Sequence, residues 1–212
     1  MSTNVTVIDY GLGNLFNVRR ALEANGGNVE LADTPEKILK AERLVLPGVG
    51  SFKDGMALLE SKNLVAPILE ATSKGRPMMG ICLGMQLLLS IGYEFGETKG
   101  LGLIEGNCSL IPNETKTGER LKRPHIGWSV LEQPSGVDWS STPLRAVKND
   151  ESVYFVHSYG AVCKDERHVL AYANYGGNKI AAAIYKDNVC GLQFHPERSG
   201  EVGLRIMKEF LR

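Results

Sequence analysis

Cys82 is the residue of this chain whose type and surroundings most directly indicate chemistry. It lies in the segment Gly80–Gly84, with the sequence GICLG, between the apolar runs Pro77–Met79 and Met85–Leu89. Glycine two residues before and two residues after a reactive side chain is typical of a nucleophile elbow. In that turn a strand passes sharply into a helix, and bulky neighbours would block it. The pattern predicts that Cys82 is a nucleophile.

A candidate base and its orienting group lie far along the chain, in the segment Gln193–Glu197 with the sequence QFHPE. Residues two apart on a strand point to the same side, so His195 and Glu197 could both face Cys82 if the extended backbone continues past Pro196. The thiolate is the reactive form of cysteine, and an imidazole can take its proton. The amides of a helix over residues 83–90 would also favour the anion. We therefore expect a Cys-His-Glu triad.

The reaction of such a triad also needs hydrogen-bond donors for the oxyanion of a tetrahedral intermediate. The amide of Leu83, directly after the nucleophile, is one candidate. Val49 and Gly50, at the end of an expected strand, could supply a second donor, because glycine lets a peptide approach closely and rotate. Without the elbow, an ordinary strand-to-helix turn would be the simpler interpretation.

Composition narrows the class of protein. The chain has 212 residues, is 43% hydrophobic and carries 24 basic and 24 acidic residues, which suits one domain over residues 1–212. The balanced charge gives no field for nucleic acid, and no apolar run approaches the roughly 20 residues needed to cross a membrane. No secretory signal is evident, so we expect a cytoplasmic protein.

The four cysteines do not form close pairs, which argues against a zinc site or a redox dithiol. We expect no metal and no cofactor, and we interpret Cys108, Cys163 and Cys190 as packing residues. The segment Gly11–Asn14 suggests a dinucleotide-binding loop, but the third glycine of that motif would fall at Phe16. A simple turn or a loop that contacts a partner fits better.

The elements that must position these residues change character along the chain. In the first half, expected strands alternate with expected helices. The strands lie at 5–9, 29–32, 43–46 and directly before Cys82. The helices lie at 15–24, 53–61, 64–73 and 83–90, with a short one that begins at 34. The second half predicts strands at 104–111, 127–131, 153–156, 168–175, 179–185 and 189–194, with a hairpin at 176–178 and a last helix at 202–211. The pattern predicts an α/β fold: an open, mostly parallel central sheet with helices on both faces and additional antiparallel strands in the second half.

Over nearly its whole length the chain resembles the class I (triad) glutamine amidotransferases. Within that family it is most similar to the glutaminase subunits of imidazole glycerol phosphate synthase, which serve histidine biosynthesis. Besides the QFHPE segment, five segments carry the resemblance, one of which contains the elbow: Pro47–Phe52, Gly80–Leu87, Gly100–Gly106, Pro124–Trp128 and Phe155–Tyr159.

The resemblance implies a mechanism and a substrate site. Cys82 would attack the side-chain amide carbon of glutamine, and His195 would protonate the leaving nitrogen so that ammonia departs. Water would then cleave the thioester to give glutamate. Gln86 and Glu94 would hold the amino end of glutamine, and the backbone around Ser158 and Tyr159 would hold its carboxylate. The assignment of Glu94 depends wholly on the family.

The resemblance also implies a partner. In the family, ammonia passes to a cyclase with a (β/α)8-barrel fold, in a heterodimer, and rotation of the peptide at Val49 completes the oxyanion hole. Asn14, Trp128 and Arg198 match positions at that interface, although Trp128 could equally be a half-buried core aromatic. Two positions depart from the histidine-pathway pattern: Ser129 replaces the usual asparagine, and Gly160 replaces a larger residue.

Three alternatives stay open on the sequence. A paralogous group of glutaminases supplies ammonia for amidination of a nucleotide sugar in surface polysaccharide synthesis, and it keeps the same triad. A stand-alone cysteine hydrolase would turn over its substrate without any partner. A non-catalytic binding module would have no reason to keep Cys82, His195 and Glu197.

Overall fold

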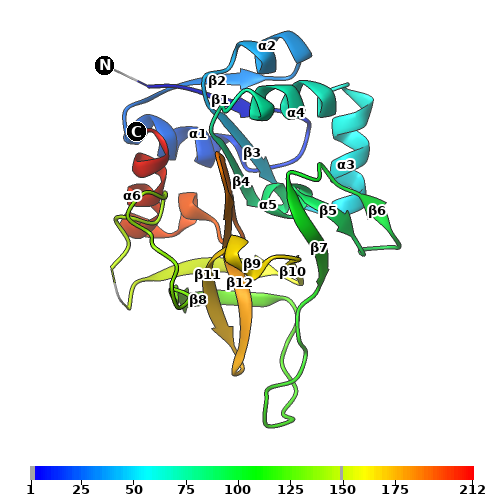
Figure 1. Ribbon diagram of the computed structural model, residues 1–212, viewed down its shortest axis with the longest axis vertical. Coiled ribbons are helices and arrows are strands. Elements are labelled where there is room, and N and C mark those ends of the chain that lie inside the picture. Colours follow the sequence, from blue (N-terminus) through cyan, green and yellow to red (C-terminus); the bar gives the residue numbers. More distant parts are fainter. Residues whose placement is uncertain (1–2, 149) are drawn as a thin grey trace.

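The computed structural model describes residues 3–148 and 150–212. Within those residues the central sheet has seven strands, in the order β11-β12-β13-β4-β3-β1-β2 (Figure 1). The strands are β1 (Thr3–Ile8), β2 (Gly27–Ala32), β3 (Leu44–Gly48), β4 (Met78–Cys82), β11 (Val169–Tyr175), β12 (Asn178–Lys186) and β13 (Val189–Leu192). β2, β1, β3, β4 and β13 run parallel, whereas β12 is antiparallel to both of its neighbours. The expected fold class is confirmed.

Helices cover both faces of this sheet (Figure 1). On one face lie α1 (Leu15–Ala24) and α6 (Gly200–Phe210), which bury apolar side chains with Val5 and Val7 of β1. On the other face lie α2 (Pro35–Lys40), α3 (Phe52–Ser61), α4 (Val65–Ser73) and α5 (Leu83–Leu87), packed against Leu44 and Leu46 of β3. Because successive residues of a strand point to opposite faces, each central strand contributes to both cores.

Local chemistry explains where several helices begin. The Asn14 side chain accepts a hydrogen bond from the Asn17 amide at the start of α1. The Ser51 hydroxyl accepts one from the Asp54 amide, 3.1 Å away, at the start of α3. These side chains satisfy amides that the first turn of a helix leaves unpaired.

The second half adds two smaller sheets. One contains β5 (Leu89–Gly92), β6 (Thr98–Lys99), β7 (Ile104–Leu110) and β10 (Tyr159–Cys163), and the other pairs β8 (His125–Val130) with β9 (Ser152–His157) antiparallel. The expected hairpin at 176–178 is confirmed as the turn between β11 and β12. Short 3-10 turns occur at η1 (Glu166–His168) and η2 (Pro196–Arg198).

The expected helix over 83–90 is wrong in length. α5 ends at Leu87, the Leu88 amide donates to Met85 O, and the chain enters β5 at Leu89. β5 pairs with β6 and β7, so sheet pairing takes over where the apolar run continues. An uninterrupted apolar run does not by itself distinguish a buried helix from a buried strand. The strand β10 was not anticipated.

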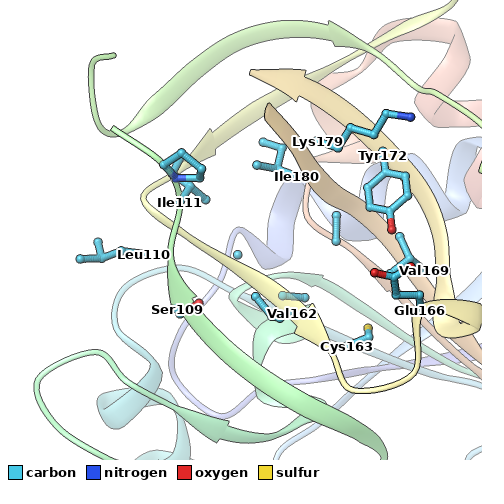
Figure 2. A pocket seen from close by; sticks show the side chains of 14 residues that line it. Ser109, Leu110, Ile111, Val162, Cys163, Glu166, Val169, Tyr172, Lys179 and Ile180 are labelled. Carbon is cyan, nitrogen blue, oxygen red and sulfur yellow. The ribbon is translucent and has the colours of Figure 1, made fainter. Parts of the chain in front are cut away.

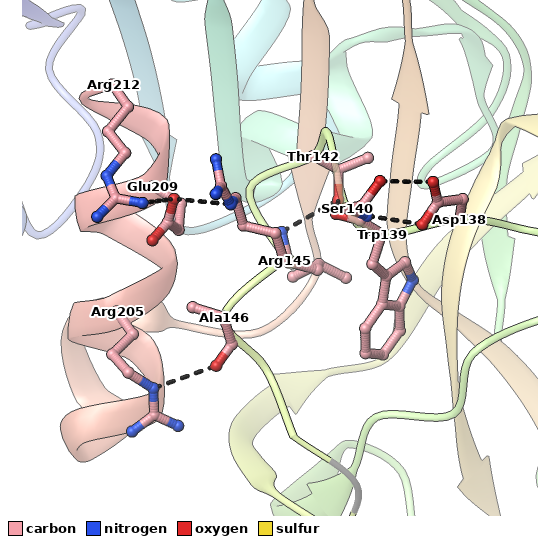
Figure 3. A network of polar contacts seen from close by, with 10 residues as sticks. Asp138, Trp139, Ser140, Thr142, Arg145, Ala146, Arg205, Glu209 and Arg212 are labelled. Atoms are coloured by element: carbon pink, nitrogen blue, oxygen red, sulfur yellow. Dashed lines mark hydrogen bonds and ion pairs between the residues drawn. The ribbon is translucent and has the colours of Figure 1, made fainter.

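The connection between β8 and β9 is tied to the main body by polar contacts (Figure 3). Arg145 forms an ion pair with Glu209 of α6, and Arg205 donates to Ala146 O. The Trp139 indole donates to Leu170 O of β11, 2.7 Å away. These contacts hold the connection against α6 and β11. In the part of the chain that the structure describes, no helix is long and apolar enough to cross a membrane.

Candidate active site

Cys82 is the last residue of β4 and directly precedes α5. Its φ is +54°, a conformation that costs energy for any residue except glycine and that clusters at active sites. A Cβ atom on Gly84 would lie 1.7 Å from Leu46 O, and one on Gly80 would lie 2.6 Å from Gly84 O. The two glycines are therefore required by close backbone approach, as a nucleophile elbow demands.

The candidate base and its orienting carboxylate are in contact. His195 Nδ1 donates to Glu197 Oε1 at 2.8 Å, and both side chains are almost fully buried. The condition set for this pairing, an extended backbone past Pro196, is not met, because residues 196–198 form the turn η2. The turn still brings the carboxylate back onto the imidazole. The His195 amide donates to Tyr154 O of β9, which fixes the backbone at this point.

Three influences set the pKa of His195. Burial lowers it, but hydrogen bonding and charge from Cys82 and Glu197 raise it, and the result is a pKa of about 10. The imidazole is therefore a cation near neutral pH. This cation lies beside the cysteine sulfur, whose nucleophilic form is the thiolate.

The other three cysteines have no such environment. Burial raises the pKa of the Cys190 thiol to about 12. Burial and the charge of Asp165 raise that of Cys163 to about 11, and burial together with Glu94 and Cys82 also raises the pKa of Cys108. These thiols stay protonated and unreactive, which agrees with their expected packing role.

A cavity of about 330 Å³ contains Cys82 and His195. Besides these two residues it is lined by Val49, Gly50, Leu83, Gln86, Glu94, Pro124, Val156, His157, Ser158 and Tyr159. The structure thus brings the predicted nucleophile and the predicted base together with every residue expected to hold the oxyanion or the substrate. Glu197 lies behind His195 and does not line the cavity.

The residues expected at the oxyanion hole leave the sheet side by side. Gly48 of β3 is opposite Cys82 of β4 in the parallel register, so Val49 and Leu83 follow from adjacent strand ends. Gly50 has φ of +104°, which a residue with a side chain would adopt only with strain. The carboxyl ends of parallel strands are where open α/β sheets form their sites.

Gln86 presents an acceptor to the cavity. Its Nε2 donates to Tyr159 O at 2.9 Å and to Gln193 Oε1 at 3.2 Å. An amide nitrogen has two hydrogens, so both are used and the side-chain oxygen remains to accept a bond from a ligand. Glu94 lies on the cavity wall, where its Oε2 accepts a bond from the Phe52 amide at 2.8 Å. Together they suit an ammonium group.

Three residues near the site were missed on the sequence. Gln193, fully buried, has its Nε2 3.8 Å from Cys82 Sγ. His157 donates from Nδ1 to Tyr159 O at 2.8 Å, and His125 contacts His157 Nε2 at 3.2 Å. Gln193 opens the QFHPE segment, and both histidines lie in segments quoted for the resemblance, but sequence spacing gave no reason to join them.

The residues expected at a partner interface lie outside the cavity. Trp128 of β8 is 56% exposed, so it is not a core aromatic. Its ring lies 6.0 Å from that of Tyr154, over which the Arg198 guanidinium lies at 4.7 Å. Asn14 caps α1, which packs against η2 where Arg198 lies.

A second cavity, of about 380 Å³, lies between β7 with β10 and β11 with β12 (Figure 2). Its walls are mostly apolar and include the exposed side chains of Leu110 and Val162. Its one thiol, Cys163, is among those whose pKa is raised, and no histidine lines this cavity. The chemistry therefore points to the cavity at Cys82.

The family model and the relatives that match this chain all indicate the same family of proteins. The model of the family "Glutamine amidotransferase class-I" matches residues 6–212. "Imidazole glycerol phosphate synthase subunit HisH 1" of Legionella pneumophila (strain Lens) is 47% identical over 211 residues, which cover 99% of each chain. The HisH subunit of Syntrophotalea carbinolica is 43% identical over 207 residues, covering 97% of this chain and 98% of that one.

Solved structures share the fold at low sequence identity. "Structure of PurLQS from Thermotoga maritima" matches with a TM-score of 0.75 and 22% identity, and covers 100% of this chain and 98% of that one. A second structure, "Crystal structure of glutamine amidotransferase", matches with a TM-score of 0.68 and 19% identity, covering 98% of each chain. At sequence identities this low, the similarity shows only that the fold is shared.

Proposed function

Since the chain belongs to the class-I glutamine amidotransferases, and within them to the HisH subunits of imidazole glycerol phosphate synthase, we propose that Cys82, His195 and Glu197 are its catalytic triad. The observation that carries the proposal is the contact of His195 Nδ1 with Glu197 Oε1 at 2.8 Å, behind a cavity that contains both the imidazole and Cys82. The whole chain acts as one amidotransferase domain, in keeping with a family match over residues 6–212.

The first half of the reaction forms a thioester. The Cys82 thiolate attacks the side-chain amide carbon of glutamine, and the carbonyl oxygen becomes an oxyanion. The amides of Leu83 and of the Val49–Gly50 segment donate to that oxygen. The intermediate collapses as the carbon–nitrogen bond breaks, and the His195 imidazolium gives its proton to the leaving nitrogen. Ammonia departs.

The second half releases glutamate. His195, now neutral, takes a proton from a water molecule that attacks the thioester carbon. The carbon–sulfur bond breaks, Cys82 returns to the thiolate, and His195 is again an imidazolium. Glu197 keeps the imidazole in one orientation and stabilises its charge throughout.

The cavity also accounts for recognition of glutamine. The oxygen of Gln86 and the carboxylate of Glu94 accept hydrogen bonds from the substrate ammonium group. The backbone around Ser158 and Tyr159, which also lines the cavity, receives its carboxylate. A site with both an acceptor pair and backbone donors distinguishes an amino acid amide from a simple amide.

Ammonia passes directly to a partner, a (β/α)8-barrel cyclase, in a heterodimer that makes imidazole glycerol phosphate. The hydrolase reaction of this chain thereby feeds a lyase reaction on the partner. The surface formed by Trp128, Tyr154 and Arg198, together with Asn14 at the start of α1, is the proposed contact. A reducing compartment such as the cytoplasm suits an enzyme that needs a free thiolate.

The test replaces the nucleophile. Cys82→Ala should abolish formation of glutamate from glutamine by the complex, whereas the same complex supplied with ammonium salt should still make imidazole glycerol phosphate. The matched control is Cys108→Ala, because that thiol is buried outside the cavity, and it should keep both activities. Glutamate formation by Cys82→Ala at the parental rate would refute the assignment of the nucleophile.

A further inference from the structure

A series of three side chains reaches the glutamine site from β8. Ser129 Oγ lies 3.1 Å from His125 Nε2, and His125 Nδ1 lies 3.2 Å from His157 Nε2. His157 Nδ1 in turn lies 2.8 Å from Tyr159 O. We call Ser129, His125 and His157 the histidine relay. None of the three belongs to the triad.

Burial lowers the pKa of both His157 and His125, and with both rings neutral the direction of every hydrogen bond in the histidine relay follows from its inner end. Tyr159 O can only accept, so His157 carries a proton on Nδ1. A neutral imidazole then accepts at Nε2, so His125 donates from its own Nδ1. His125 accepts at Nε2, and the Ser129 hydroxyl donates to it. Each neutral ring therefore carries its proton on Nδ1.

Packing holds the relay in this state. The His125 ring is stacked on Phe155 with centroids 5.1 Å apart, and the Tyr175 ring lies 4.4 Å away. His157 is buried against Phe155 at 5.7 Å. Burial lowers the pKa of His157 to about 4 and also lowers that of His125. Neither ring gains a charge near neutral pH.

The inner end of the relay meets the glutamine site at a single atom. Tyr159 O accepts from His157 and also from Gln86 Nε2, at 2.9 Å. Gln86 continues to Gln193, whose Nε2 lies 3.8 Å from Cys82 Sγ. The position of this carbonyl therefore affects both the peptide on the cavity wall and the side chain that is proposed to hold the substrate ammonium group.

We propose that the histidine relay is a positioning device for glutamine: it fixes the Tyr159 peptide and, through it, Gln86. This inference rests on the proposed function, because it assigns the relay to that same site. The outer end lies on the strand that carries the proposed partner surface. Along β8 the side chains of Ile126, Trp128 and Val130 are exposed, and His125 and Ser129 lie on the other face. A partner seated on the exposed face would touch the same strand that holds the outer donor.

The first test is spectroscopic and needs no partner. In the intact chain at about pH 7, long-range nitrogen–proton NMR spectra of the imidazole rings should show His125 and His157 neutral and protonated at Nδ1. Ser129→Ala should shift the His125 ring signals most and the His157 signals less. A proton on Nε2 of His157, or a charged ring at either position, would overturn the proposal.

The second test separates glutamine binding from turnover, in the complex with the cyclase. His157→Phe keeps a ring but loses the donor to Tyr159 O, and should raise KM for glutamine about three- to tenfold, the range expected for one lost hydrogen bond. The value of kcat should stay within about twofold, since Cys82, His195 and Glu197 are untouched.

Two further variants make this test decisive. In His157→Asn the side-chain amide places a donor near the position of Nδ1, so KM should return most of the way to the parental value. Tyr175→Phe changes a hydroxyl on a ring that contacts His125 without touching any relay bond, and should leave KM unchanged. An unchanged KM in His157→Phe, or no rescue in His157→Asn, would refute the proposal.

The outcomes distinguish the relay from the proposed function. If the parental complex fails to hydrolyse glutamine, the proposed function is wrong, and the imidazole spectra still decide whether the relay exists. If His157→Phe does not fold, the spectra of the parental chain and of Ser129→Ala, together with KM for His157→Asn, decide the matter.

Discussion

At the scale of single residues, the charge of His195 depends on neighbours that act against burial. Its pKa of about 10 lies above the usual 6.5 because Cys82 and Glu197 favour the cation. The imidazolium is therefore present at neutral pH and is lost as pH rises through about 10. The raised pKa of His195 also stabilises the folded chain. This contribution to the free energy of unfolding is fully present below the unfolded-state pKa of about 6.5, and it is lost as the pH rises from there through the folded-state pKa of about 10.

Replacing the orienting carboxylate should move this titration. In Glu197→Gln the neutral amide cannot stabilise the cation, so the alkaline limb of the kcat/KM profile for glutamine should fall by at least about one pH unit. The rate at neutral pH should fall roughly a hundredfold or more, because the imidazole loses its fixed orientation. A pH–rate profile of the complex measures both effects.

Glu201→Gln is the matched control, because Glu201 is an exposed acid in the first turn of α6. Its profile should overlay that of the parental enzyme. An alkaline limb that stays in place in Glu197→Gln would mean that the carboxylate does not set the charge of His195.

At the scale of elements, the elbow depends on the approach of α5 to β3. A methyl group on Gly84 would lie 1.7 Å from Leu46 O, and backbone cannot move aside as a flexible side chain can. Gly84→Ala should therefore lower the free energy of unfolding by about 3 kcal/mol or more, at the upper end of overpacking effects. Urea denaturation followed by circular dichroism measures the loss.

Gly55→Ala in α3 provides a comparison for the same substitution in another helix. The atoms nearest to a Cβ there are the ends of the Leu87 and Leu83 side chains, at 3.1 and 3.3 Å. Small shifts relieve that contact, and alanine favours a helix over glycine by about 1 kcal/mol. We expect stability within about 1 kcal/mol of the parent. Equal effects of the two variants would contradict the account of the elbow.

The sequence predicted the alternating first half of the fold because its strands and helices are separated by glycine, proline and capping residues. The bounds of α1 were predicted as observed, 15–24. The prediction failed after the elbow, because Leu87–Leu89, where α5 ends and β5 begins, are all apolar and contain no glycine or proline to mark the end of a helix. The choice there depends on β7, which pairs with β5 from further along the chain.

The residues of the candidate site likewise fall into those that the sequence predicted and those that it did not. The elbow and the QFHPE segment can be recognised locally, because each needs a fixed spacing of residue types. The buried contacts of Gln193, His157 and His125 could not be predicted. The three residues come from the end of β13, from β9 and from β8, and no local sequence pattern determines how these strands align with one another. The turn η2 was missed because a short 3-10 segment and an extended one can both place a carboxylate on the preceding imidazole.

At the scale of the whole molecule, we expect the exposed surface around Trp128 to contribute to cyclase binding but little to the stability of the isolated chain. Trp128 is 56% exposed and contacts the ring of Tyr154 only at its edge. Trp128→Ala should weaken binding of the cyclase about 30-fold or more, as for a typical aromatic hot spot. Unfolding of the isolated chain should change by less than about 1 kcal/mol. Titration calorimetry and urea denaturation give the two quantities.

Leu110→Ala serves as the control, because Leu110 is 54% exposed on β7, at the cavity of Figure 2. It should leave binding of the cyclase unchanged. Cyclase binding that survives Trp128→Ala but is lost in Leu110→Ala would move the interface to the surface around Leu110.

The unequal environments of the four cysteines have a practical consequence. Three sulfurs are kept as inert thiols inside the folded chain, while the fourth opens into a cavity beside a cation. A mild alkylating probe should therefore consume one equivalent per intact molecule and more only after unfolding. The amount of an ordinary thiol reagent that the native protein consumes should therefore equal the amount of competent enzyme in a preparation.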